Sequence, residues 1–234
     1  MDINVISPLN QLGYGVVGLN IVRELSQLVN LSFWPIGNVS CPIEHRGVVQ
    51  SCLDNAKMPN FNAPCIKIWH QFDMSNFIGK GKHIGFPIFE LDRFNEQEIH
   101  HLSSLDHIFV CSDWAKGVVE DNVPSLYGSI SIIPLGVDSS IFLPSNSSRP
   151  ETIFFNCGKW EVRKGHDVLV EAFNSAFSED DNVELWMMCE NPFYSREENL
   201  YWENLYKQSK LGSKIRIIPR QETQKEVYNI MHQV

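Results

Sequence analysis

Short apolar runs alternate with stretches of helical periodicity along most of this chain. Strand-like runs are expected at residues 3–7, 31–36, 63–69, 84–89, 107–110, 130–134, 152–156, 183–188 and 214–218. Helical patterns are expected after Gly18 and at residues 95–105, from 113 onward, and at 164–177, 196–210 and 223–232. Ser112 is the expected N-cap of the helix that begins at Asp113. Such alternation predicts an α/β architecture with parallel sheets.

A Pro- and Ser-rich stretch at residues 143–151 is the strongest linker signal in the chain. It predicts two domains, an N-terminal one at residues 1–147 and a C-terminal one at residues 148–234. The C-terminal part contains only three strand–helix units. A typical sheet has about five or six strands, so we expect this second domain to be incomplete.

Charge and cysteine content exclude several classes of protein. The net charge of −9, from 19 Lys and Arg against 28 Asp and Glu, argues against a general nucleic-acid surface. No apolar run has the length of a membrane span, and the N-terminus lacks the basic region of a signal peptide. The six cysteines show neither a Cys-x-x-Cys pair nor a zinc spacing. We therefore expect reduced thiols, a cytoplasmic location and no metal site.

Gly13, Gly15 and Gly18 match the Gly-x-Gly-x-x-Gly pattern of dinucleotide-binding proteins. However, five residues lengthen the preceding turn, and no acid occurs between Glu24 and Glu44 to bind a ribose. A nicotinamide or flavin site is therefore the least favoured interpretation. Two others stay open: a flexible loop whose amides approach a ligand at a helix N-terminus, and a tight strand-to-helix connection without a ligand.

Three cations, Lys159, Arg163 and Lys164, follow the strand at 152–156 and precede a helix. Cations at a helix N-terminus oppose the helix dipole, which costs about 0.3–1 kcal/mol at an exposed site. Their presence there indicates an anion site, to which the helix amides would add donors. The alternative is a solvated loop whose cations pair with Glu161 and Asp167. The residues alone do not decide between the two.

The segment Cys157–Leu169, Cys-Gly-Lys-Trp-Glu-Val-Arg-Lys-Gly-His-Asp-Val-Leu, resembles the donor-site motif of family 4 retaining glycosyltransferases. The segments Pro8–Gly18, Asp106–Lys116 and Ile132–Asp138 resemble other parts of these enzymes, in the same order. The resemblance implies a GT-B fold, with two Rossmann-like domains facing a cleft: an acceptor domain, and a donor domain that binds the nucleotide-sugar.

In that family, two cations of the basic motif neutralise the diphosphate of a UDP- or GDP-sugar without a metal or other cofactor. The resemblance assigns this role to Lys159 and Lys164, and Arg163 is a third candidate without a defined role. Lys159 stands where the family more often has Arg, so a bidentate fork becomes a point charge. Preorganised cations suit a leaving diphosphate, because its negative charge grows in the transition state.

The resemblance also implies roles in the N-terminal domain. Gly13 and Gly15 would supply backbone amides to the ligand. His70, at the end of a strand, would line the sugar pocket, although a buried structural histidine is the alternative. Glu90 is a second candidate at the acceptor, against an ion pair with Arg93.

Family members also carry two acids eight residues apart, one for the sugar and one for the ribose. These 234 residues lack that motif, so we expect little or no turnover from them and describe the chain as a C-terminally truncated transferase. The acceptor, whether glycan, lipid or another molecule, is not indicated. The rival hypothesis is a non-catalytic module that binds a sugar-nucleotide, an anion or a partner chain. An incomplete sheet would then favour self-association.

Overall fold

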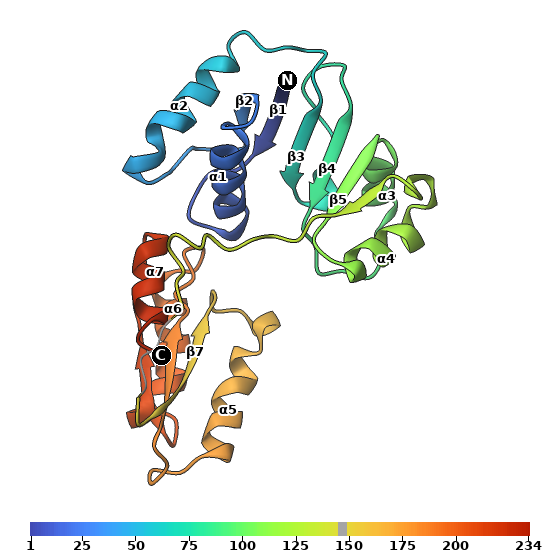
Figure 1. The fold of residues 1–234 in the computed structure, drawn as a ribbon. Helices are drawn as coiled ribbons and strands as arrows, with labels where there is room; N and C mark the ends of the chain where they lie inside the picture. Colours follow the sequence, from blue (N-terminus) through green and yellow to red (C-terminus); the bar gives the residue numbers. More distant parts are fainter. Residues whose placement is uncertain (145–148) are drawn as a thin grey trace. The chain divides into compact units, whose positions relative to one another are not determined.

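The computed structural model describes residues 1–144 and 149–234. Within these ranges the chain forms two compact units, Met1–Gly136 and Val137–Val234, which we call unit 1 and unit 2 (Figure 1). The middle of the linker expected at 143–151 and the boundary expected between residues 147 and 148 fall on residues 145–148, which lie outside the described residues.

Unit 1 is built on a six-stranded parallel sheet with the order β2-β1-β3-β4-β5-β6. Its strands are β1 (Asp2–Ser7), β2 (Asn30–Pro35), β3 (Cys65–Trp69), β4 (His83–Pro87), β5 (His107–Val110) and β6 (Ile130–Ile132). The chain leaves β1 for β2 on one side, and β3 pairs with β1 on the other side. The strand order therefore reverses between β1 and β3. Ligands of open α/β sheets bind beyond the carboxyl ends of the strands at such a switch point.

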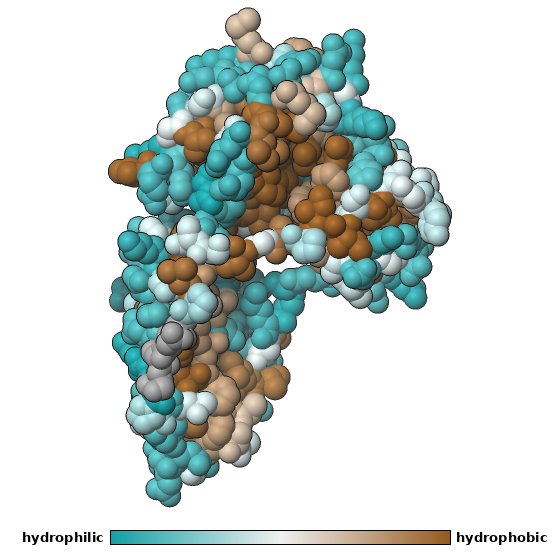
Figure 2. All heavy atoms as spheres, viewed as in Figure 1, coloured by the Kyte–Doolittle hydropathy of each residue, from teal (hydrophilic) through white to brown (hydrophobic). Residues whose placement is uncertain are grey.

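The helices of unit 1 are α1 (Gly13–Leu25), α2 (Arg46–Asn55), α3 (Glu96–Ser103) and α4 (Asp113–Asn122), with short 3-10 turns at Ile43–His45, Gln71–Asp73 and Pro124–Leu126. The helix α2, which buries Val49 and Cys52, was not predicted. The predicted N-cap at Ser112 is confirmed, because its side chain accepts a hydrogen bond from the Ala115 amide. Figure 2 shows apolar residues gathered over β3 and β4 on the face in view, as expected for the strands of a parallel sheet.

The glycine-rich segment differs from the expectation of a loop, since α1 already begins at Gly13. Gly15 and Gly18 lie inside the helix. A Cβ atom on Gly15 would lie 2.3 Å from the Asn10 backbone nitrogen, and one on Gly18 would lie 2.3 Å from the Pro8 carbonyl oxygen. The low helix propensity of glycine is therefore outweighed by the close approach of the segment that leaves β1.

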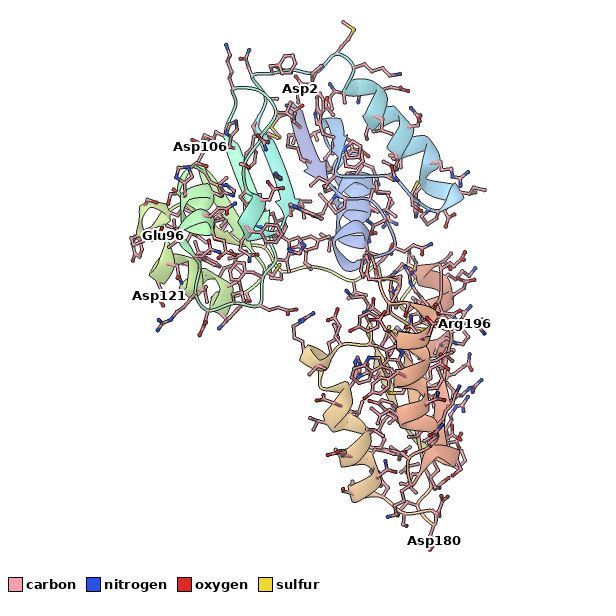
Figure 3. All side chains as sticks on the ribbon, turned by 180° about the vertical axis from the view of Figure 1, so that it is seen from behind. Asp2, Glu96, Asp106, Asp121, Asp180 and Arg196 are labelled. Carbon is pink, nitrogen blue, oxygen red and sulfur yellow. The ribbon has the colours of Figure 1, made fainter. Side chains whose placement is uncertain are left out.

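Unit 2 contains a three-stranded parallel sheet with the order β7-β8-β9. Its elements are β7 (Thr152–Cys157), a 3-10 turn at Val162–Lys164, α5 (His166–Ala176), β8 (Val183–Met188), α6 (Arg196–Lys207), a 3-10 turn at Gly212–Lys214, β9 (Ile215–Ile217) and α7 (Gln224–Met231). Residues of α5 and α6 pack into one apolar cluster, and those of α7 pack into a second. Figure 3 labels Arg196 at the start of α6 and Asp180 at the opposite end of unit 2.

The helix expected to start at Lys164 starts at His166. Gly165, with φ of 70°, separates it from the 3-10 turn that carries Arg163 and Lys164. This left-handed conformation favours glycine and interrupts the helical hydrogen bonding. The three cations therefore precede the helix and do not occupy its first turn.

Candidate functional site

The carboxyl edge of the sheet in unit 1 brings together side chains from three segments. Tyr14, in the first turn of α1, donates a hydrogen bond from its hydroxyl to the Ile88 carbonyl after β4. Its ring centroid lies 5.4 Å from that of Trp69 and 4.6 Å from that of His70, at the end of β3. Burial raises the pKa of the Tyr14 hydroxyl to about 12, so this hydroxyl is a permanent donor at neutral pH. These residues occupy the switch point between β1 and β3.

His70 has the features of a ligand-facing histidine. Its ring packs edge-on against Trp69 at 4.8 Å and stacks on half-exposed Phe72 at 4.9 Å. Within residues 1–144 and 149–234 its ring nitrogens make no hydrogen bond, whereas the neighbouring Gln71 side chain donates one to Glu98 at 2.9 Å. Burial lowers the pKa of His70 below its ordinary value, which favours the neutral imidazole. A neutral ring with an unused donor and acceptor suits contact with sugar hydroxyls.

The predicted amide donors Gly13 and Gly15 occupy the first turn of α1. Leu12, the N-cap, offers no side-chain cap, and the first helical bond runs from the Val16 amide to the Leu12 carbonyl at 2.9 Å. The amides before Val16 therefore lack an acceptor in their own helix. Among the described residues, a Cβ on Gly13 would meet no atom within 4 Å. Packing thus explains Gly15, whereas Gly13 leaves open space at the helix N-terminus.

Glu90 follows β4 and is exposed. Its charge contributes, as the smallest cause, to the raised pKa of the Tyr14 hydroxyl. It therefore lies at the same edge of the sheet as Tyr14. Its role at an acceptor stays a prediction.

In unit 2, residues 158–165 connect β7 to α5, and we call this segment the cation loop. A buried side chain and backbone hydrogen bonds hold it in place. Trp160 is only 1% exposed and stacks on Trp202 of α6 with ring centroids 5.8 Å apart. The Trp160 amide donates to the Cys189 carbonyl at 2.7 Å, and its carbonyl accepts from the Asn191 side chain at 3.0 Å. The loop is therefore held against the carboxyl end of β8.

The three predicted cations do not share one environment. Glu161 pairs with Lys159 at 3.0 Å and with Arg163 at 2.9 Å. The side chain of Lys164 makes no ion pair or hydrogen bond within the part of the chain that the structure describes, and it lies over Gly158, just after β7. The salt-bridged alternative thus holds for Lys159 and Arg163 through Glu161, whereas Lys164 is available to an external anion.

The charges of the cation loop are coupled through Glu161. Burial alone would raise the pKa of its carboxyl group, but hydrogen bonds and charge from Lys159 and Arg163 outweigh this and hold the pKa below its ordinary value. Glu161 is therefore ionised at neutral pH. It holds both cations in place and reduces the positive potential that they offer to a ligand.

The sequence pattern did not single out two residues of this region. Trp160 anchors the cation loop, and His166 lies beneath it. His166 is fully buried, and its Nδ1 accepts a hydrogen bond from the Glu161 amide at 3.1 Å. Both residues lie inside the Cys157–Leu169 motif, and this was the signal in the sequence that could have indicated them. Only the packing of α6 shows that their side chains point inward. Among the described residues, no group of three or more His, Cys, Asp or Glu side chains could hold a metal ion.

No protein-family model and no curated protein matches the sequence. Among solved structures, sucrose-phosphate synthase from Thermosynechococcus elongatus is similar, with a TM-score of 0.69 and 14% identity over 99% of this chain and 73% of that chain. A glycosyltransferase from Rickettsia africae ESF-5 is similar with a TM-score of 0.67 and 15% identity, over 99% of this chain and 70% of that chain. No helix of the described residues combines the length and apolarity needed to cross a membrane. The α/β fold with parallel sheets, predicted to be of the GT-B type, is confirmed by this likeness.

Proposed function

We propose that this chain is a glycosyltransferase, or the sugar-nucleotide-binding part of one, that takes its donor as a nucleoside diphosphate sugar. The observation that carries the proposal is the cation loop at the carboxyl end of β7, where Lys164 is available and two further cations are held 3.0 Å and 2.9 Å from Glu161. A diphosphate is the anion that such a loop fits, because its charge is spread over several oxygens. The likeness to glycosyltransferase structures supports this choice over other phosphate ligands.

The edge of unit 1 would receive the sugar or the acceptor. His70 offers a neutral imidazole, and Gly13 leaves room for a ligand at the N-terminus of α1. Helix N-termini favour ligands with negative or partial negative charge. We infer that the transfer proceeds with retention and without a metal, as the resemblance of the Cys157–Leu169 motif implies.

Binding is the more direct test, because the cation loop would contact the diphosphate of the donor. UDP and GDP should each raise the melting temperature by several degrees at 100 times Kd, where ligand binding contributes about 2.7 kcal/mol. UMP and GMP, which lack the second phosphate, should give clearly smaller shifts at equal concentration. Equal shifts from mono- and diphosphates would show that the cation loop does not select a diphosphate.

Glu161→Gln should increase diphosphate affinity by about three- to tenfold. The substitution keeps the size of the side chain but removes the negative charge that opposes the ligand beside Lys159 and Arg163. Calorimetric titration with UDP measures the change. Glu171→Gln, on the exposed surface of α5, removes the same charge elsewhere and should change the affinity by less than about twofold. A loss of affinity in Glu161→Gln alone would mean that Glu161 serves mainly to position the cations.

A second candidate function, a partner-binding module, has one specific observation in its favour. In the described residues, β7 pairs only with β8, and Phe154 on this edge strand is 43% exposed. Unpaired strand edges can recruit another chain. Sedimentation velocity over a range of concentrations tests this candidate, because a module of this kind should form dimers, and a chain that stays monomeric would contradict it.

A further inference from the structure

His166 occupies a position where both ring nitrogens are committed. Its Nδ1 accepts from the Glu161 amide at 3.1 Å, and its Nε2 lies 3.3 Å from Asn156 Oδ1. Only the neutral tautomer with the proton on Nε2 satisfies both contacts, because Nδ1 must accept while Nε2 donates. The Tyr206 hydroxyl donates to the His166 carbonyl, and the ring packs edge-on against Trp160 at 5.1 Å. The imidazole is therefore fixed in one orientation beneath the cation loop.

The bond to the Glu161 amide connects this buried ring to the loop surface. Glu161 is the residue that pairs with Lys159 and Arg163. Its carbonyl accepts a hydrogen bond from the Lys164 amide at 3.1 Å, so the position of this backbone segment sets where Lys164 stands. Protonation of Nδ1 would replace an attractive contact by two donors facing each other, at a site that is 0% exposed. A buried donor without an acceptor is destabilising, so protonation favours displacement of the loop.

We infer that His166 is a positioning residue for the anion site, holding the cation loop in its binding conformation only while the imidazole is neutral, so that diphosphate binding weakens on acidification. The inference rests on the proposed function, since it concerns the same anion site. It adds a control of that site by pH.

The titratable groups around His166 lie in the cation loop, on α5, after β8 and on α6. Lys164, on the preceding turn, disfavours a second positive charge, whereas Glu161 and Asp167 favour one; Cys189 after β8 and Tyr206 on α6 are neutral. Burial is the largest cause, and the pKa of His166 lies below its ordinary value. The unfolded chain then takes up a proton at higher pH than the folded one. The loop conformation is therefore fully stabilised above about pH 6.5 and loses stability as the pH falls below that value.

Two substitutions separate the functions of the two ring nitrogens. His166→Asn places an acceptor where Nδ1 stands, and His166→Gln places a donor where Nε2 stands. At about pH 7.5, we expect His166→Asn to bind inorganic pyrophosphate within about threefold of wild type, and His166→Gln to bind at least about fivefold more weakly. Calorimetric titration gives both affinities, and thermal melts identify any variant that fails to fold.

The pH profile supplies the readout that a merely structural role would not change. Between about pH 7.5 and pH 5.0, the affinity of wild type relative to His166→Asn should fall by at least about fivefold, a ratio that cancels the titration of pyrophosphate itself. A constant ratio, or His166→Gln binding as tightly as wild type, would overturn the inference.

If the variants do not fold, an NMR titration of the unmodified chain tests the same inference. In amide NMR spectra, the Glu161 resonance should shift with the same midpoint as the His166 ring protons. A Glu161 amide that stays constant while His166 titrates would contradict the inference. If wild type binds no pyrophosphate at all, the proposed function fails, and the NMR titration still shows whether His166 positions the loop.

Discussion

Trp160→Ala is expected to lower the free energy of unfolding of unit 2 by about 3–5 kcal/mol, the range for removal of a large aromatic side chain from a core. Trp160 is 1% exposed and contacts the rings of Trp202, Tyr206 and His166, with centroids 5.8, 5.3 and 5.1 Å away. Such a loss is large for a unit of this size, because domains are stable by only about 5–15 kcal/mol. Diphosphate binding should be lost together with stability, since the same residue anchors the cation loop.

Chemical denaturation followed by fluorescence or circular dichroism measures the change. Tyr201→Ala is the matched control, because it removes an aromatic ring from α6 that is 65% exposed, and it should change stability by less than about 1 kcal/mol. If Trp160→Ala unfolded at the same denaturant concentration as wild type, the described packing of the cation loop would be wrong.

Gly15→Ala is expected to destabilise unit 1 by several kcal/mol or to displace the segment after β1. The new Cβ would lie 2.3 Å from the Asn10 backbone nitrogen and 2.4 Å from the Asn10 carbonyl oxygen. Backbone atoms cannot rotate away, so either the helix or the segment must move. Gly13→Ala provides the comparison, because its Cβ would meet no described atom within 4 Å, and alanine favours a helix over glycine by about 1 kcal/mol.

Thermal melts of the two variants test this difference directly. Gly13→Ala should melt no lower than wild type, yet bind the nucleotide-sugar or acceptor more weakly if a ligand approaches the N-terminus of α1. Gly15→Ala should melt well below wild type. Equal melting temperatures for both variants would remove the structural distinction between the two glycines.

Much of the fold follows from the sequence, because apolar strands and helical periodicity report directly on burial. The strands β5 and β8 were predicted residue for residue, and β1 to within one residue. The helix α2 was missed, although Val48, Val49, Cys52 and Leu53 recur at helical spacing. The early start of α1 was missed since the contacts of Gly15 and Gly18 are tertiary, and no local propensity reports them.

The sequence indicated the cations of the candidate site but not how they pair. The pattern of Lys159, Arg163 and Lys164 indicated an anion site or a salt-bridged loop with equal weight. The structure divides these cations, because Glu161 on an extended backbone reaches Lys159 and Arg163 while the left-handed Gly165 ends the turn at Lys164. Such a division depends on backbone angles that spacing alone does not give.

The most direct test of the account is calorimetric titration of UDP and GDP into wild type, Lys164→Ala and Lys210→Ala. Lys210, after α6, contacts the Asn174 carbonyl near the end of α5, far along the chain from the cation loop, and serves as the charge-matched control. A hydrogen bond to a charged group contributes about 1.5–3 kcal/mol, so Lys164→Ala should weaken binding by about tenfold or more, and Lys210→Ala by less than about twofold. Equal affinities of wild type and Lys164→Ala for both nucleotides would contradict the assignment of the cation loop as a diphosphate site.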